Sequence, residues 1–291
     1  MKKILFDTDI GSDIDDALAL AYLLREPECE LLGITTVSGQ PVERAKLASA
    51  ICRAAGRDDI PIYPGLEGPI LGRQLQPRAA QAEKLCNWSH REEFGMFSAV
   101  EFMRRTIREN PGEVTLLAVG PMTNVAALFL LDPEIPSLLD SLVLMCGDFG
   151  EGTTRNEWNS KCDWAATACI YGKKVRLHRS FGLNVTLLLT LEREEVERNF
   201  RADIMAPVKD FAYTWFAGGG KRMVFHDPLA ALSIFHPEVC GYKRGNATIC
   251  TDRPGSLGYS TFEENEDGMH EIAVTVDKER FFTLYFDTVN S

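Results

Sequence analysis

Five aspartates within ten residues directly follow a short apolar segment near the start of the chain. Residues 2–6 form an apolar run bounded by charge, which predicts a buried parallel strand, and residues 17–24 predict a helix. The acidic residues therefore fall in the turn from strand to helix; they are Asp7, Asp9, Asp13, Asp15 and Asp16. In an open α/β sheet, such turns lie at the carboxyl ends of the strands, where these folds bind their ligands.

Carboxylates at this density repel one another, and burying them without partners is costly. Solvent could balance the charge, but the apolar segments on both sides bury the chain, and Gly11 permits a close turn. A hard cation with oxygen ligands is the natural partner, and carboxylate-rich sites of adaptable geometry favour Ca²⁺ over Mg²⁺. An EF-hand is excluded, because a loop that starts at Asp7 has Gly11 one position too early and Leu18 in place of the glutamate.

The composition limits the class of protein. With 291 residues, of which 45% are hydrophobic, the chain can form one large α/β domain. The net charge of −11 argues against a nucleic-acid polymer as partner, but a free nucleoside carries no phosphate and is not excluded. We expect no signal peptide, and the sequence has no apolar run of membrane length and no metal-finger spacing among its eight cysteines. We therefore expect a cytoplasmic protein with free thiols and no membrane partner.

Segments typical of buried strands alternate with helical patterns along the chain. Strands are predicted over residues 29–37, 60–65, 114–119, 141–146, 174–177, 184–189 and 271–276. Helices are predicted over residues 41–56, 96–109, 192–199, 204–216, 229–235 and 278–289. This order predicts a single α/β domain, residues 1–291, with a mostly parallel, Rossmann-like open sheet flanked by helices and an active site at the carboxyl ends of the strands.

Polar residues recur where the predicted strands end. Gln40 follows the second strand, either as an ordinary loop residue or as a contact to the site. Glu157 and Asn159, two residues apart, would face the same side of an extended chain and could hold the vicinal hydroxyls of a ribose. His226 and Asp227 begin an apolar helix, where an aspartate is most often an N-cap. The irregular stretch 67–93 has the length of a functional or mobile loop.

Together these segments resemble the nucleoside hydrolases, the inosine-uridine-preferring N-ribohydrolase family. The matching segments are Asp7-Thr8-Asp9, Asp15-Asp16-Ala17, Gly120 to Asn124, Met145-Cys146-Gly147, Glu157-Trp158-Asn159 and His226-Asp227-Pro228. The family usually has proline where this chain has Ile10, and asparagine where it has Gln40. Two extra residues, Ser12 and Asp13, lengthen the acidic loop.

The resemblance implies hydrolysis of the N-glycosidic bond of a ribonucleoside to free base and ribose. It implies a Ca²⁺ ion held by Asp9, Asp16, Asp227 and the Val119 carbonyl. Asp9 would also be the general base, and His226 would protonate the leaving base. The substrate contacts that it implies are Asp15, Gln40, Met145, Glu157 and Asn159. The partner would be a small-molecule nucleoside, and we expect a homo-oligomer, a dimer or a tetramer.

Two other classes of protein stay open at this point. A haloacid-dehalogenase-type phosphatase also has a strand that ends in Asp-x-Asp, here Asp7-Thr8-Asp9, although that class has Thr or Val where this chain has Gly11. A non-catalytic ribose or nucleoside binder of the same fold would keep the site without turnover. The nucleobase is not predicted, because the loops expected to contact it, 67–93 and 213–225, carry no pattern specific to purine or pyrimidine.

Overall fold

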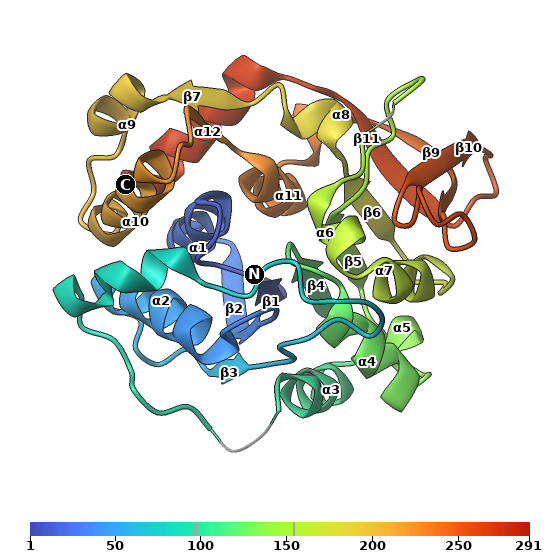
Figure 1. Ribbon diagram of the computed structural model, residues 1–291, viewed down its shortest axis with the longest axis horizontal. Coiled ribbons are helices and arrows are strands. Elements are labelled where there is room, and N and C mark those ends of the chain that lie inside the picture. Colours follow the sequence, from blue (N-terminus) through green and yellow to red (C-terminus); the bar gives the residue numbers. More distant parts are fainter. Residues whose placement is uncertain (96–97, 154) are drawn as a thin grey trace.

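A nine-stranded sheet runs through the computed structural model, which describes residues 1–95, 98–153 and 155–291 (Figure 1). Its strands lie in the order β10 (Ser260–Glu264), β9 (Cys240–Ile249), β11 (His270–Val276), β6 (His178–Phe181), β5 (Ser141–Met145), β4 (Val114–Ala118), β1 (Lys2–Thr8), β2 (Cys29–Thr36) and β3 (Ile62–Pro64). Neighbours from β3 to β11 pair in parallel, whereas β9 is antiparallel to both β11 and β10. The prediction of a mostly parallel sheet is confirmed.

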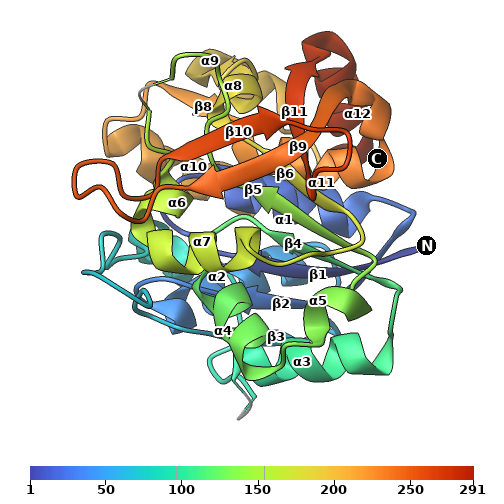
Figure 2. The same ribbon diagram turned by 90° about the vertical axis from the view of Figure 1, so that its right-hand side faces the viewer.

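Helices cover both faces of the sheet (Figures 1 and 2). One layer contains α1 (Asp15–Arg25), α2 (Pro41–Ala54), α10 (Met205–Ala217), α11 (His226–Phe235) and α12 (Lys278–Val289). The other contains α3 (Ala99–Glu109), α4 (Thr123–Leu131), α5 (Ile135–Leu138) and α7 (Trp164–Tyr171). Alternate side chains of β1 explain this arrangement, because Ile4 and Phe6 pack into the first layer and Leu5 packs into the second.

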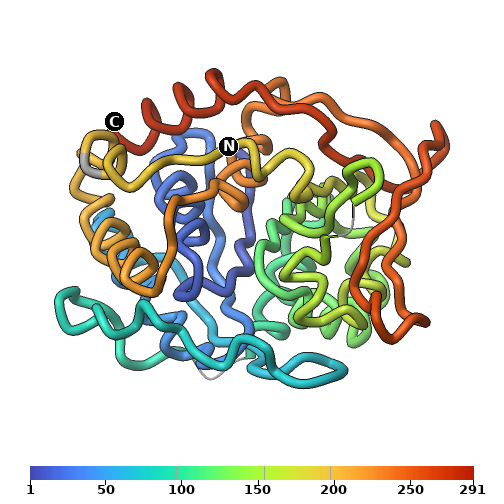
Figure 3. The backbone as a smooth tube through the Cα atoms, turned by 45° about the horizontal axis from the view of Figure 1, so that its top comes forward, coloured from blue at the N-terminus to red at the C-terminus, as the bar shows by residue number. Residues whose placement is uncertain are grey.

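Shorter elements connect these layers. They are η1 (Ala80–Asn87), α6 (Trp158–Cys162), α8 (Leu183–Thr186), α9 (Arg193–Asn199) and η2 (Pro237–Val239), together with a two-stranded antiparallel sheet of β7 (Thr190–Glu192) and β8 (Arg222–Val224). The stretch 67–93 contains η1 but is otherwise irregular, and Figure 3 shows it in cyan along one edge of the molecule.

Helix α1 is the central element of its layer and begins at the acidic loop, here residues 9–14. Its residues from Asp15 to Leu23 are buried, and it packs against α2, α10, α11 and α12. A helix that is apolar on all sides is expected in such a buried position. Because α1 directly follows β1 and the acidic loop, its burial brings Asp15 and Asp16 into the interior at the carboxyl end of the sheet.

Two predicted strands are wrong. Residues 184–189 form most of α8 and the turn after it, because a short apolar run does not by itself distinguish a strand from a helix. The strand predicted over 174–177 is found instead at His178–Phe181. The β9–β10 hairpin was not predicted, because β9 interrupts its apolar residues with Gly241 and Gly245. Residues 96 and 97 of the helix predicted over 96–109 lie outside the described residues.

Among the described residues, no helix is both long enough and apolar enough to span a bilayer.

The core contains a buried histidine whose protonation should limit stability in acid. His178 in β6 is 1% exposed, its ring lies 4.9 Å from that of Tyr171 and 4.6 Å from that of His270, and both of its ring nitrogens lack a hydrogen-bond partner among the described residues. Burial lowers the pKa of His178 well below its usual value, and the neighbouring His270 lowers it further. At mildly acidic pH, His178 therefore stays neutral in the folded protein but binds a proton in the unfolded chain.

We expect His178→Phe to reduce the loss of stability in acid. A histidine with a lowered pKa stabilises the folded state above about pH 6.5, and this contribution falls by up to about 1.4 kcal/mol per pH unit below that value. As the pH falls from 7.5 to 5, the Tm of the variant should rise relative to that of the wild type. His236→Gln, at a half-exposed position, serves as the control. The same change in Tm in all three proteins would contradict the prediction.

Candidate active site

A cavity of about 570 Å³ opens at the carboxyl ends of β1, β4 and β5. The structure brings nine of the ten predicted site residues to this cavity. They are Asp9, Asp15, Asp16, Val119, Met145, Glu157, Asn159, His226 and Asp227. Residues so distant in the sequence meet because β1, β4 and β5 are adjacent in the sheet and α11 packs against α1.

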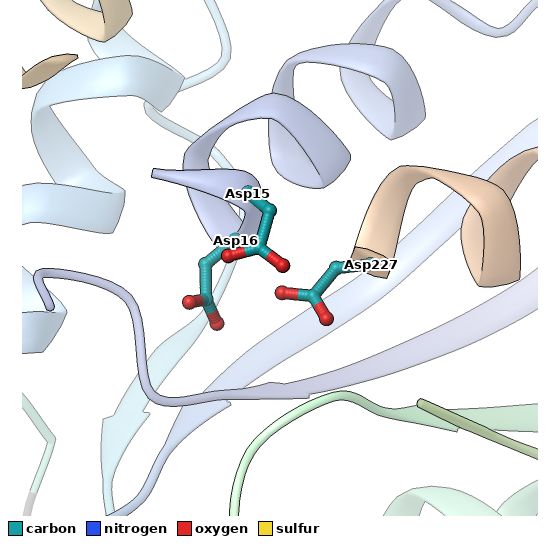
Figure 4. Close-up of side chains that lie close together, drawn as sticks. All are labelled: Asp15, Asp16 and Asp227. Carbon is teal, nitrogen blue, oxygen red and sulfur yellow. The ribbon is translucent and has the colours of Figure 1, made fainter. Parts of the chain in front are cut away.

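Three of these carboxylates are close enough to share a cation. Asp15 and Asp16 lie in the first turn of α1, and Asp227 lies in the first turn of α11 (Figure 4). One oxygen atom from each of the three lies within 4.8 Å of the others, and all three residues are buried. The positive ends of two helix dipoles therefore meet three negative side chains. Buried carboxylate oxygens in such a group form a suitable site for a hard divalent cation.

Burial and mutual repulsion disfavour the charged form of these groups. The pKa values of Asp15, Asp16 and Asp227 lie well above the usual range, chiefly because of desolvation and then because of the neighbouring aspartates. Desolvation also raises the pKa of Asp13 to about 6. Asp16 is held in place through its Oδ1 atom, which accepts hydrogen bonds from the Thr8 hydroxyl and from the Asp9 amide, the latter at 3.1 Å. Its Oδ2 atom stays available to a cation.

A buried arginine under the acidic loop supplies positive charge. Arg44 in α2 is 0% exposed, and its guanidinium donates to the carbonyls of Gly39, at 2.8 Å, and of Asp9 and Ile10. We did not predict this residue. The available signal was its position in α2, because Arg44 shares a helical face with the apolar residues Leu47, Ala48 and Ile51.

The first two aspartates of the chain differ in their surroundings. Asp9 lines the cavity, and its Oδ2 atom accepts a hydrogen bond from Gln76. Asp7 is 0% exposed, and its Oδ1 atom accepts hydrogen bonds from Thr35, at 2.6 Å, and from Asn124, at 2.8 Å. Asp7 does not line the cavity, so it cannot act as the exposed nucleophile that a phosphatase of the haloacid dehalogenase type requires.

Glu157 and Asn159 reach the cavity in a different conformation from the predicted one. Residues 158–162 form helix α6 rather than an extended chain, and Glu157 is its N-cap. The Glu157 carboxylate accepts backbone hydrogen bonds from Asn159 at 2.7 Å, Ser160 at 2.9 Å and Gly147 at 3.1 Å. Asn159 Nδ2 donates to the carbonyl of Val119, the predicted metal ligand. The first turn of α6 and its N-cap therefore place both side chains at the carboxyl ends of the strands.

His226 lies at the entrance to α11 beside the acidic group. Its Nδ1 atom is 2.7 Å from the Thr186 hydroxyl, and desolvation lowers the pKa of His226 to about 4. The ring is therefore neutral at neutral pH and can act as a hydrogen-bond donor or acceptor. Trp215, in the stretch 213–225 that we expect to contact the base, lines the cavity.

Gln40 is the predicted site residue that does not line the cavity. Its backbone adopts a left-handed conformation, with φ of 59°, at the N-cap of α2. The side chain is exposed and accepts a hydrogen bond from the Ala79 amide at 2.9 Å. The structure does not bring Gln40 to the cavity, and its role as a substrate contact stays a prediction. A side-chain amide does reach the Asp9 carboxylate, and it belongs to Gln76, which the sequence did not indicate.

The fold and the cavity define an α/β enzyme with a candidate cation site at the carboxyl ends of its strands. The family model described as inosine-uridine preferring nucleoside hydrolase matches residues 4–283, and the chain belongs to this family. The predicted resemblance and the assignment as an enzyme, a nucleoside hydrolase, are confirmed.

Relatives and solved structures agree with this assignment. The chain is 28% identical over 270 residues to probable uridine nucleosidase 1 from Oryza sativa subsp. japonica, covering 86% of this chain and 81% of that protein. It is 29% identical over 269 residues to the pyrimidine-specific ribonucleoside hydrolase RihA from Citrobacter koseri, covering 81% and 80%. The solved purine-preferring ribonucleoside hydrolase from Gardnerella vaginalis superposes with a TM-score of 0.85 at 25% identity, covering 99% of this chain and 98% of that one.

The raised pKa values predict how a cation should affect stability. Without a cation, the folded state holds protons on Asp15, Asp16 and Asp227 that the unfolded chain releases above about pH 4, so stability is lost as the pH rises toward the folded pKa values. A bound divalent cation replaces these protons. The rise in Tm on adding Ca²⁺ or Mg²⁺ should therefore be larger at pH 8 than at pH 5.

Differential scanning fluorimetry at both pH values measures this effect. At a cation concentration 100 times its Kd, we expect about 2.7 kcal/mol of stabilisation at pH 8. Asp227→Asn, which removes one charge of the group, should show a much smaller rise. A rise of the same size in this variant, or one independent of pH, would disprove the cation site.

Proposed function

We propose that the enzyme cleaves the N-glycosidic bond of a ribonucleoside and releases free base and ribose. The observation that carries this proposal is the meeting of Asp15 and Asp16 with Asp227 in one cavity that also contains Glu157 and His226. Separate groups are thereby available for a cation, for the sugar and for the leaving base. Membership of the family and the relatives named for ribonucleoside hydrolysis support the same reaction.

We propose Ca²⁺ as the cation. The buried oxygens of Asp16 and Asp227 would hold it, together with the Asp9 carboxylate and the Val119 carbonyl, which line the same cavity. The Val119 carbonyl already accepts a hydrogen bond from Asn159, but a carbonyl oxygen has a second lone pair. Carboxylate and carbonyl oxygens in an adaptable arrangement are the ligands that Ca²⁺ prefers. When bound, the ion would orient the water and the ribose hydroxyls and acidify the water.

The sugar would be held by Asp15, Glu157 and Asn159, with Met145 against the ring. The Glu157 carboxylate accepts three backbone hydrogen bonds and interacts with the Cys146 thiol, so a sugar hydroxyl would take the acceptor site of this weak donor. Asn159 uses Nδ2 for the carbonyls of Val119 and Met145, the latter at 3.2 Å, which leaves Oδ1 to accept a second hydroxyl. Carboxylates around the ring would also stabilise the positive charge of an oxocarbenium-like transition state.

Activation of the water and activation of the leaving base would fall to residues at different places in the cavity. Asp9 would remove a proton from the attacking water as general base. The neutral His226 would donate a hydrogen bond from Nε2 to the departing base and stabilise its developing negative charge, and the released base would take its proton from solvent water. The Thr186 hydroxyl, donating to Nδ1, would keep the proton of the neutral ring on Nε2, since its oxygen is 2.7 Å from Nδ1.

The nucleobase stays open, because the relatives carry names for uridine, for pyrimidine and for purine substrates. The homo-oligomer and the cytoplasmic location also stay predictions. A non-catalytic binder with the same site is the alternative, and it would bind a nucleoside without releasing the base.

We expect base release from at least one member of a panel of inosine, uridine, cytidine, adenosine, guanosine and nitrophenyl riboside. Chelation should abolish this release, and Ca²⁺ should restore it. Asp9→Asn, as the matched variant, should stay folded and lose about 10²- to 10⁴-fold in kcat, the typical contribution of a general base. Tight nucleoside binding without release would identify a binder, and a nearly normal rate for Asp9→Asn would exclude Asp9 as the base.

Replacement of His226 should depend on the leaving group. His226→Ala removes the proposed hydrogen-bond donor, so kcat should fall by about 10²-fold or more with inosine, whose base is a poor leaving group, and much less with nitrophenyl riboside. Steady-state kinetics on both substrates give the comparison. Equal losses on the two substrates would mean that His226 does not activate the leaving base.

A further inference from the structure

The carboxylate proposed as general base is held by an amide that the sequence did not indicate. Gln76 is 9% exposed, and its Nε2 atom donates to Asp9 Oδ2. The predicted amide, that of Gln40, points away and binds the backbone of Ala79. A residue of the irregular stretch 67–93 thus occupies the position beside Asp9.

The orientation of this amide is defined at its other end. Trp158 Nε1 donates to Gln76 Oε1 at 2.5 Å. An indole N–H can only donate, so the oxygen of the amide faces Trp158 and its NH₂ group faces Asp9. Trp158 stands between Glu157 and Asn159, the residues that we assign to the sugar. A continuous path of side chains therefore connects the sugar segment to the general base.

The backbone around Gln76 is fastened to the acidic loop and to the end of β2. The backbone N–H of Gln76 donates to Gln74 Oε1 at 2.7 Å, and its backbone carbonyl accepts from the Ser38 hydroxyl at 3.4 Å. Gly39 permits this close approach, because a Cβ there would lie 2.5 Å from the Gln76 carbonyl oxygen. Arg44, which binds the carbonyls of the acidic loop, also donates to the Arg78 carbonyl at 3.3 Å. Gln76 therefore reaches Asp9 from a fixed segment.

We propose that Gln76 is a positioning residue, which orients the Asp9 carboxylate for proton removal and ties this orientation to Trp158. The inference rests on the proposed function. One N–H donor on Oδ2 fixes the plane of the carboxylate and leaves its other acceptor sites for the water. Misplacement of a catalytic group by about 1 Å can cost about 10²-fold in rate, so the loss of this contact should reduce kcat rather than substrate binding.

The test compares Gln76→Ala, Trp158→Phe and the double variant on the best substrate of the panel. Gln76→Ala should lower kcat by about 10- to 100-fold, with KM and cation affinity changed by less than about threefold. Trp158→Phe keeps a ring but removes the indole donor, and it should cause a smaller loss. If Trp158 acts through Gln76, the double variant should have a kcat less than about twofold below that of Gln76→Ala alone.

Controls separate positioning from folding. Trp88→Phe removes a similar indole donor outside the cavity, where Trp88 Nε1 donates to Asp210 at 2.9 Å. This variant should keep the wild-type kcat. Gln76→Met keeps the side-chain length but has no hydrogen-bond donor, so it gives the same test if the alanine variant fails to fold, and its loss should be similar. An active wild type with normal kcat in both Gln76 variants, or an undiminished Trp158→Phe effect in the double variant, would overturn this inference alone. An inactive wild type would overturn the proposed function instead.

Discussion

The structure depends on the burial of several carboxylates at one point, where β1 ends and α1 and α11 begin. Asp15, Asp16 and Asp227 lie there with little exposure to water, and their charged forms are strongly disfavoured. Two helix N-termini and the buried guanidinium of Arg44 offset part of this cost. In the proposed enzyme, a divalent cation would offset most of the remaining negative charge of these neighbouring carboxylates.

The same constraint organises the loops around the cavity. Arg44 holds the carbonyls of the acidic loop and that of Arg78, so it joins segments that follow β1 and β3. Gln76 and Trp158 extend this network to the segment after β5. A buried polar group without a partner is costly, and each hydrogen bond in such a network restricts the position of the next group. The active site is consequently a network of loops fixed by hydrogen bonds on a rigid sheet rather than a set of independent side chains.

Local patterns predicted the parts of the fold that local physics controls. The strands β1, β4 and β5 are continuous apolar runs, and they were predicted because buried parallel strands need apolar residues on both faces. Predictions failed where short segments depend on distant neighbours. Residues 184–189 pack as a helical turn although they also suit a strand, and β9 is a strand because β10 and β11 pair with it, not because its own residues favour one.

For the site, the sequence alone determined the chemical groups and their position at strand ends: the acidic run, Glu157 with Asn159, and His226 with Asp227. Only the tertiary structure decided which of them meet. It joined Asp227 to Asp15 and Asp16 through the packing of α11 on α1, turned Gln40 outward, and brought Gln76 to Asp9. The physical reason is that residue types and strand ends are local properties, whereas contacts between distant segments follow from the order of strands and the packing of helices, which the whole chain determines.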